Sequence, residues 1–97
     1  MTIWTDGGAT MAGCPGLARA AWATFSDTAH GLCRCGVVPS LATNSRAELY
    51  AAVVAALCRT GPLLIVNDST YVAKGLLRLA KRAGQPDCLH GDLWYAL

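Results

Sequence analysis

The sequence predicts an α/β fold with a mixed sheet, and three observations support this. The N-terminal part contains three short β-rich segments joined by links that contain glycine or proline. Apolar residues at helical spacing follow, and after them comes a short continuous apolar run, Leu63–Val66. A change from β-rich segments to a helical period is typical of a sheet with helices packed on it.

Three segments are expected to form the first strands. Thr2–Thr5 is β-rich and ends at the turn signal Asp6–Gly8, and residues 9–16 are expected to form a loop. Leu17–Ser26 and Leu32–Val38 are the predicted second and third strands. Because the links between these strands are short, we expect them to pair in antiparallel fashion.

Helical periodicity begins in the second half of the chain. The apolar residues that recur at the spacing of one helix face are Leu49, Ala52, Val53, Ala56 and Leu57. A polar residue among Thr43–Ser45 is expected to cap this helix, and Gly61–Pro62 to end it. Leu63–Val66 then predicts a strand buried on both faces. Ser69–Ala83 and Asp92–Leu97 predict a second helix and the start of a third.

Three acidic residues lie where these elements begin or end. Asp6 and Asp68 follow the first and fourth strands, and Glu48 lies in the first turn of the first helix. If strand four is parallel to strand one through a right-handed connection, all three acids meet at one edge of the sheet. Carboxylates held close together need a cation, so the sequence predicts a magnesium site. The alternative is that they are ordinary surface acids at turns.

Composition limits the other inferences. The 97 residues allow one domain, and the 54% hydrophobic share is rich in alanine, which predicts a thin core. A net charge of +2 does not identify a polyanionic partner. Four basic residues follow one another at helical spacing: Lys74, Arg78, Lys81 and Arg82. They form either a solvated helix face or a face that contacts phosphates. No apolar stretch approaches the roughly 18 residues of a membrane span, so no membrane partner is expected.

The cysteines argue for a reducing environment. The sequence contains Cys14, Cys33, Cys35, Cys58 and Cys88, an odd number with no Cys-x-x-Cys pair and no signal peptide. We therefore expect reduced thiols and a cytoplasmic or nuclear protein that is not secreted. His30 lies near Cys33 and Cys35, and His90 lies near Cys88, but these spacings match no usual zinc pattern. Buried or incidental thiols are the expectation.

The order of the motifs closely resembles the type 1 ribonuclease H family. The matching segments are Thr5–Gly8, Thr43–Leu49, Asp68–Val72 and Gly91–Trp94, and they span nearly the whole chain. The resemblance implies a ribonuclease H-like three-layer fold over residues 1–97. Its mixed sheet has strands one to three antiparallel, strand four parallel to strand one, and helices packed on it.

The resemblance also implies an activity, namely endonucleolytic hydrolysis of the RNA strand of RNA–DNA hybrids by two-metal-ion catalysis. The cofactor would be Mg²⁺, with Mn²⁺ as a substitute. Asp6 matches the carboxylate that bridges both ions, and Glu48 and Asp68 match the other metal-ligating and catalytic acids. Substrate contacts are implied for Gly7, Thr43, Asn44, Ser45 and Thr70. Residues 43–45 acting only as helix caps are the alternative.

Some parts of the family pattern have no match in this sequence. The pattern continues with a fifth strand, a loop that bears a histidine, and a final helix that presents a fourth acid. His30, His90 and Asp92 do not match those places. We therefore expect a single incomplete domain with the fifth strand missing, an uncovered edge on strand four, and weak or absent catalysis. A non-catalytic remnant that binds nucleic acid is the alternative function, and a reverse-transcriptase-type polyprotein is one candidate host.

Overall fold

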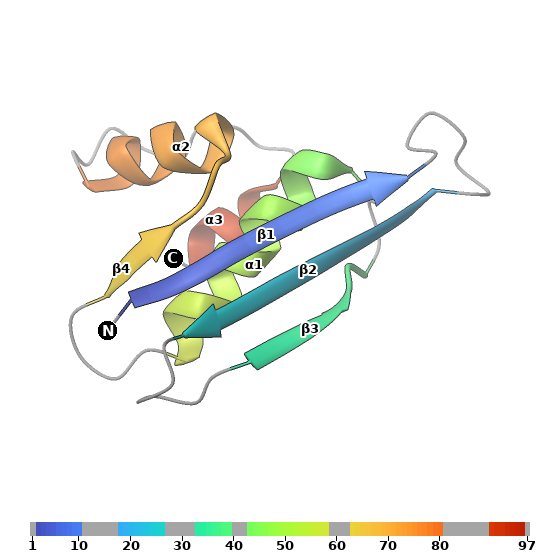
Figure 1. Cartoon of the computed structure of the whole chain (residues 1–97). Helices are drawn as coiled ribbons and strands as arrows, with labels where there is room; N and C mark the ends of the chain where they lie inside the picture. The colour runs from blue at the N-terminus through green and yellow to red at the C-terminus, as the bar shows by residue number, and fades with distance from the viewer. Residues whose placement is uncertain are drawn as a thin grey trace.

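The computed structural model describes residues 2–10, 18–26, 33–39, 43–58, 63–80 and 90–96. In chain order the elements are β1 (Thr2–Thr10), β2 (Arg19–Ser26), β3 (Cys33–Val37), α1 (Asn44–Cys58), β4 (Leu64–Val66), α2 (Thr70–Ala80) and α3 (Gly91–Ala96). The strands form one sheet in the order β3-β2-β1-β4 (Figure 1). This is the element order that the sequence predicts.

The strand directions also agree with the prediction. β1 pairs with β2, and β2 with β3, in antiparallel fashion. β4 is parallel to β1 and pairs with it over only three residues, from Thr2 opposite Leu64 to Trp4 opposite Val66. The mixed sheet with strand four parallel to strand one is therefore confirmed.

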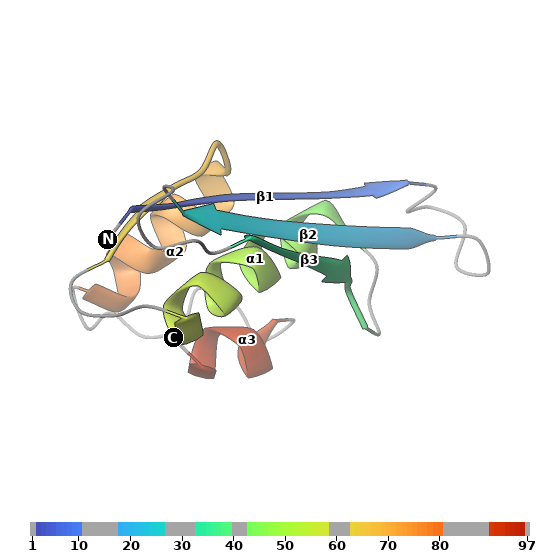
Figure 2. The same ribbon diagram turned by 60° about the horizontal axis from the view of Figure 1, so that its bottom comes forward.

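All three helices lie on the same side of the sheet. Figure 2 shows the sheet first, then α1 and α2, and then α3 on the far side of α1. The helix α1 approaches the sheet closely because the residues it buries are mostly small. Ala47, Ala51, Ala52 and Ala55 are fully buried. None of the described helices is both long enough and apolar enough to cross a lipid bilayer.

One hydrophobic cluster lies between α1, α2 and α3, and its buried residues are Leu49, Ala52, Val53, Val72, Leu93 and Trp94. A second cluster, between the sheet and α1, consists of Ala20, Val38 and Ala47. Trp94 packs so closely against Gly75 that a Cβ at that position would overlap its ring. Leu93 and Trp94 are thus core residues.

The opposite face, which we call the outer face of the sheet, has no helix on it within the described ranges. Along β1, Ile3 and Thr5 face α1 and are buried, whereas Trp4 and Asp6 point to the outer face. The exposed large apolar side chains on this face are Trp4, Phe25, Val37, Leu64 and Val66. The rings of Trp4 and Phe25 stack with their centroids 5.6 Å apart.

Two expectations about the strands are wrong. β4 is not buried on both faces, since Leu64 is 61% and Val66 40% exposed on the uncovered outer face. β1 does not end at the glycines but continues to Thr10, because β2 pairs with it from Ile3 to Thr10. Asp6 therefore lies inside a strand rather than at its end.

Candidate metal centre

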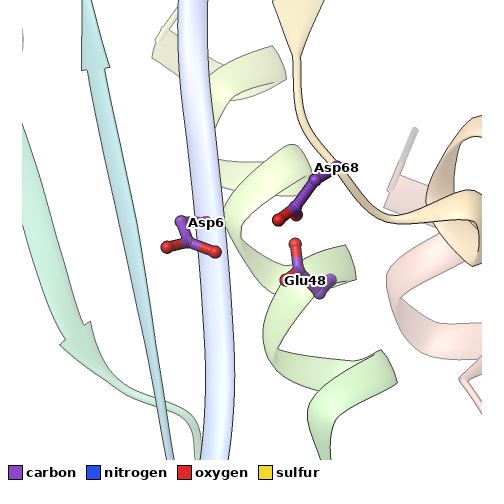
Figure 3. A group of neighbouring side chains, drawn as sticks. All are labelled: Asp6, Glu48 and Asp68. Atoms are coloured by element: carbon purple, nitrogen blue, oxygen red, sulfur yellow. The ribbon is translucent and has the colours of Figure 1, made fainter.

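Three elements bring the three predicted acids together. Asp6 comes from β1, Glu48 from α1 and Asp68 from the segment directly after β4 (Figure 3). Trp4 and Val66 are the last paired residues of β1 and β4, and Asp6 and Asp68 each lie two residues further on. The carboxylates each offer an oxygen within 4.8 Å of the others. Glu48 lies just beyond the first turn of α1, one residue later than expected.

Gly7 determines how closely α1 approaches β1 at this point. A Cβ added to Gly7 would lie 2.6 Å from the backbone nitrogen of Glu48 and 2.7 Å from the carbonyl oxygen of Ala47. Only glycine therefore permits this spacing without a backbone shift. The Gly7 N–H also donates a hydrogen bond to Oδ1 of Asp6 at 2.9 Å. A direct contact between Gly7 and substrate stays a prediction.

Two side chains hold the first turn of α1. Thr43 is the N-cap, and its Oγ1 accepts a hydrogen bond from the backbone N–H of Arg46 at 3.2 Å. Oδ1 of Asn44 accepts a hydrogen bond from the backbone N–H of Ala9 at 2.6 Å. This bond fastens α1 to β1 beyond the last pair with β4. The capping alternative thus describes Thr43, whereas Asn44 joins two elements and leaves its amide nitrogen for other contacts.

The other two expected substrate residues lie close to the acids in the chain. Ser45 is half-buried in the first turn of α1. Thr70 is exposed at the start of α2, two residues after Asp68. The cap of α2 is Ser69, whose Oγ accepts a hydrogen bond from the backbone N–H of Val72 at 3.3 Å. The Thr70 hydroxyl is therefore not needed for capping.

The electrostatics of the cluster favour a cation. Burial raises the pKa of Glu48, and the nearby negative charges of Asp68 and Asp6 raise it further. A hydrogen bond from the backbone of Gly7 offsets part of this increase. Oε2 of Glu48 is buried and has no hydrogen-bond partner in the described part of the chain. A buried carboxylate oxygen without a donor, beside two further carboxylates, fits a hard divalent cation such as Mg²⁺.

Asp92 belongs to a different interaction. It forms a bidentate ion pair with Arg46, with distances of 3.1 Å from Nη1 to Oδ1 and 2.7 Å from Nη2 to Oδ2. The Arg46 side chain is 8% exposed and that of Asp92 61%. The hydrogen bond from Arg46 lowers the pKa of Asp92. Asp92 is thus not a member of the acid cluster, in agreement with the sequence, and it fastens α3 to the first turn of α1.

Arg46 is the residue whose importance was missed from the sequence. It lies within the Thr43–Leu49 motif, but no role was inferred for it. Nη1 of Arg46 also lies 3.4 Å from Nδ1 of the buried His90. The sequence did contain a signal for this ion pair. Arg46 is a charged residue among small and apolar neighbours, and Asp92 is an acidic residue at the start of a later helix.

The fold and the acid cluster together define an α/β protein with a candidate divalent-cation site at the junction of β1, α1 and β4. The family model of RNase H matches residues 1–92. The chain belongs to the ribonuclease H family.

The proteins that are similar to the chain include a bacterial enzyme and a viral one. A Ribonuclease H of Pseudomonas paraeruginosa (strain DSM 24068 / PA7) is 40% identical over 65 residues, which cover 57% of this chain and 44% of the bacterial protein. A foamy viral protease-reverse transcriptase, solved in complex with dsDNA, superposes with a TM-score of 0.68 and 25% identity. That match covers 98% of this chain and 69% of the viral one. The match spans less than half the length of the bacterial relative.

Proposed function

We propose that this chain hydrolyses the RNA strand of RNA–DNA hybrids at a divalent-cation site formed by Asp6, Glu48 and Asp68. The convergence of the three carboxylates within 4.8 Å is the observation that best supports this. Membership of the ribonuclease H family supports the reaction class. The unpaired buried oxygen of Glu48 supports the presence of a cation ligand.

We assign Mg²⁺ as the cofactor, with Mn²⁺ as a substitute. When bound, Mg²⁺ would act as a Lewis acid that polarises the scissile phosphate and lowers the pKa of coordinated water. The carboxylate of Glu48 points toward that of Asp68, and Asp6 lies to one side of this pair (Figure 3). Asp6, Glu48 and Asp68 would therefore be the residues that hold the ion, and a second ion at the same cluster is implied only by the family resemblance.

The protein groups have separate tasks in this proposal. Gly7 fixes the approach of α1 to β1 and its N–H orients Asp6. Asn44 uses its carbonyl oxygen to fasten α1 to β1, so its amide nitrogen is the part that would donate to substrate. In the wide minor groove of a hybrid, acceptor atoms and 2′-hydroxyls are available to such a donor. Ser45 and Thr70, which are close to Glu48 and Asp68 in the chain, have shorter side chains and are the other proposed donors.

The phosphate backbone requires a basic surface as well. Lys74 and Arg78 are exposed on α2, four residues apart and thus on one helix face. We assign them to contacts with phosphates near the acid cluster, since α2 begins directly after Asp68. Lys81 and Arg82, expected to extend this face, lie outside the described residues.

Hybrid cleavage by the purified chain tests the proposal. The substrate is an RNA–DNA duplex with a label on the RNA strand, and duplex DNA and single-stranded RNA are controls. We expect slow cleavage of the RNA strand that requires Mg²⁺ or Mn²⁺ and disappears in Asp68→Asn. Slow turnover is expected because the described acid cluster has three carboxylates, one fewer than the family resemblance implies.

The outcomes separate the two candidate functions. Tight binding of the hybrid without cleavage at any Mg²⁺ concentration would favour the non-catalytic alternative. Cleavage that persists in Asp68→Asn, or in the presence of a chelator, would refute the assigned site. Membership of a longer polyprotein with a reverse transcriptase is a further proposal, suggested by the likeness to the foamy viral protein.

A further inference from the structure

Two cysteines on β3 form an exposed pair. Cys33 and Cys35 are both free and exposed, so of the two expectations, buried or incidental thiols, burial does not apply to them. They alternate with Arg34, so both side chains lie on the same face of the strand. Exposed cysteines are uncommon, because free cysteine is among the most buried residue types. Two of them on one face of an edge strand therefore need an explanation.

The two thiols cannot form a disulfide with each other while β3 is extended. Residues two apart on a strand have their Cα atoms about 6.6 Å apart, and same-face Cβ atoms are similarly separated. A disulfide needs Cβ atoms about 3.8 Å apart. A metal ion relaxes this requirement, since two sulfur ligands of tetrahedral Zn²⁺ lie about 3.7 Å apart at Zn–S distances of about 2.3 Å. Side-chain rotation can bring the two sulfur atoms to such a separation.

The surface beside the pair is hollowed. Ala23 lies opposite Cys35 on one side and opposite Asp6 on the other, so these residues form a row across the outer face. The hollow over this row has a volume of about 340 Å³ and is lined by Asp6, Gly7, Gly8, Ala21, Trp22, Ala23 and Cys35. Because its floor consists largely of small residues, an ion held at Cys35 has room for additional water ligands.

The pair is too far from the acids to share an ion with them. Neighbouring strands lie about 4.8 Å apart, so the Cα atoms of Asp6 and Cys35 are about 10 Å apart. The two clusters also differ in chemistry. Carboxylates select hard ions such as Mg²⁺, whereas thiolates select soft or borderline ions such as Zn²⁺ and Cd²⁺.

We propose that Cys33 and Cys35 form a dithiolate site for a soft divalent ion on the outer face of the sheet, separate from the carboxylate cluster. The protein supplies two sulfur ligands, and water in the adjoining hollow completes the coordination. Binding releases the thiol protons. The inference does not depend on the proposed nuclease activity.

Titration with Cd²⁺ tests the proposal, because the ultraviolet charge-transfer band from thiolate to Cd²⁺ reports sulfur ligation alone. The test protein is the full chain, reduced, with C14S, C58S and C88S, so that only the pair remains. We expect one Cd²⁺ per chain. We expect C33S or C35S, added singly, to weaken binding by about 100-fold, since chelation is lost. Circular dichroism confirms that each variant is folded.

The most informative control keeps two cysteines in β3 but shifts one of them by one position. The double variant C35S/R34C keeps two cysteines but places them on opposite faces of β3. The proposal predicts that its Cd²⁺ affinity falls as far as that of C35S alone. Equal affinity in C35S/R34C and in its parent would overturn the proposal, as would the absence of the band in the parent. A large excess of Mg²⁺ is expected to leave the band unchanged, and loss of the band would also count against a thiolate site.

Discussion

Replacing Gly7 with alanine tests how the acid cluster is built. The added Cβ would lie 2.6 Å from the nitrogen of Glu48 and 2.7 Å from the oxygen of Ala47, against about 3.4 Å for ordinary contacts. Both atoms belong to the backbone of a packed helix, so α1 must move away from β1 by several tenths of an ångström. Such overpacking costs about 1–3 kcal/mol. For a domain of this size each kcal/mol lowers Tm by about 4–8 °C.

The same movement separates Glu48 from Asp6. We expect the affinity for Mg²⁺ to fall by about 10–100-fold, the range seen when groups that position metal ligands are changed. Thermal unfolding and calorimetric titration with Mg²⁺ measure the two effects.

Gly8→Ala is the matched control, because a Cβ at Gly8 meets nothing within 4 Å. It should leave the Mg²⁺ affinity unchanged, and its Tm should stay constant or rise slightly as the unfolded chain loses entropy. If Gly7→Ala and Gly8→Ala behave alike in both measurements, the inferred role of Gly7 is wrong.

Three further predictions concern the side chains around the cluster. Asn44→Asp keeps the acceptor for the Ala9 N–H but loses the amide donor, so its Tm should be unchanged and its affinity for the hybrid should be lower. Asn44→Ala loses the acceptor as well, so both its Tm and its affinity for the hybrid should be lower. Equal Tm values for the two variants in thermal unfolding would contradict this. Since the pKa of Glu48 is raised in the folded state, its contribution to stability is lost as pH rises through that pKa. Glu48→Gln should therefore raise the Tm at neutral pH without Mg²⁺, and this gain should vanish below the carboxyl pKa of the unfolded chain. Asp92→Asn should cost about 1 kcal/mol at neutral pH, the upper end of the range for exposed pairs, because Asp92 is exposed although Arg46 is buried. Since the pKa of Asp92 is lowered, the cost measured by denaturant unfolding should shrink as pH falls through it, and a constant cost would contradict the ion-pair account.

The order and type of the elements could be predicted because each has a local signal. The apolar spacing of α1, the polar residues before it and the short apolar run of β4 all depend on neighbours in sequence. The meeting of Asp6 and Asp68 followed from one topological rule, the parallel right-handed connection. These parts of the prediction needed no knowledge of packing.

The length of β1 could not be predicted from local signals. Gly7 and Gly8 are typical of a turn, yet both lie within a strand whose ladder with β2 continues to Thr10. The glycine at position 7 is explained by the backbone of α1, which lies 40 residues further along the chain. Glycine is favoured both in turns and where the backbone of another element approaches closely. Only the structure shows that the second reason applies to Gly7.

The burial of β4 and the roles of Asn44 and Arg46 were missed for a related reason. A continuous apolar run is typical of a strand covered on both faces, but here the described helices all lie on one side. The partners of Asn44 and Arg46, Ala9 and Asp92, are distant in sequence. Such long-range partners leave no periodic pattern in the sequence.

If Asp6, Glu48 and Asp68 form one divalent-cation site, a paramagnetic ion should bind there. Substoichiometric Mn²⁺ broadens the amide signals of nearby residues in a ¹⁵N-correlated NMR spectrum, which locates a bound ion directly. We expect the broadening to centre on Gly7, Glu48 and Asp68, to be reversed by Mg²⁺ and to be absent in Asp68→Asn. Broadening centred on Asp92, or a pattern that Asp68→Asn leaves unchanged, would show that the ion is not held by these three acids.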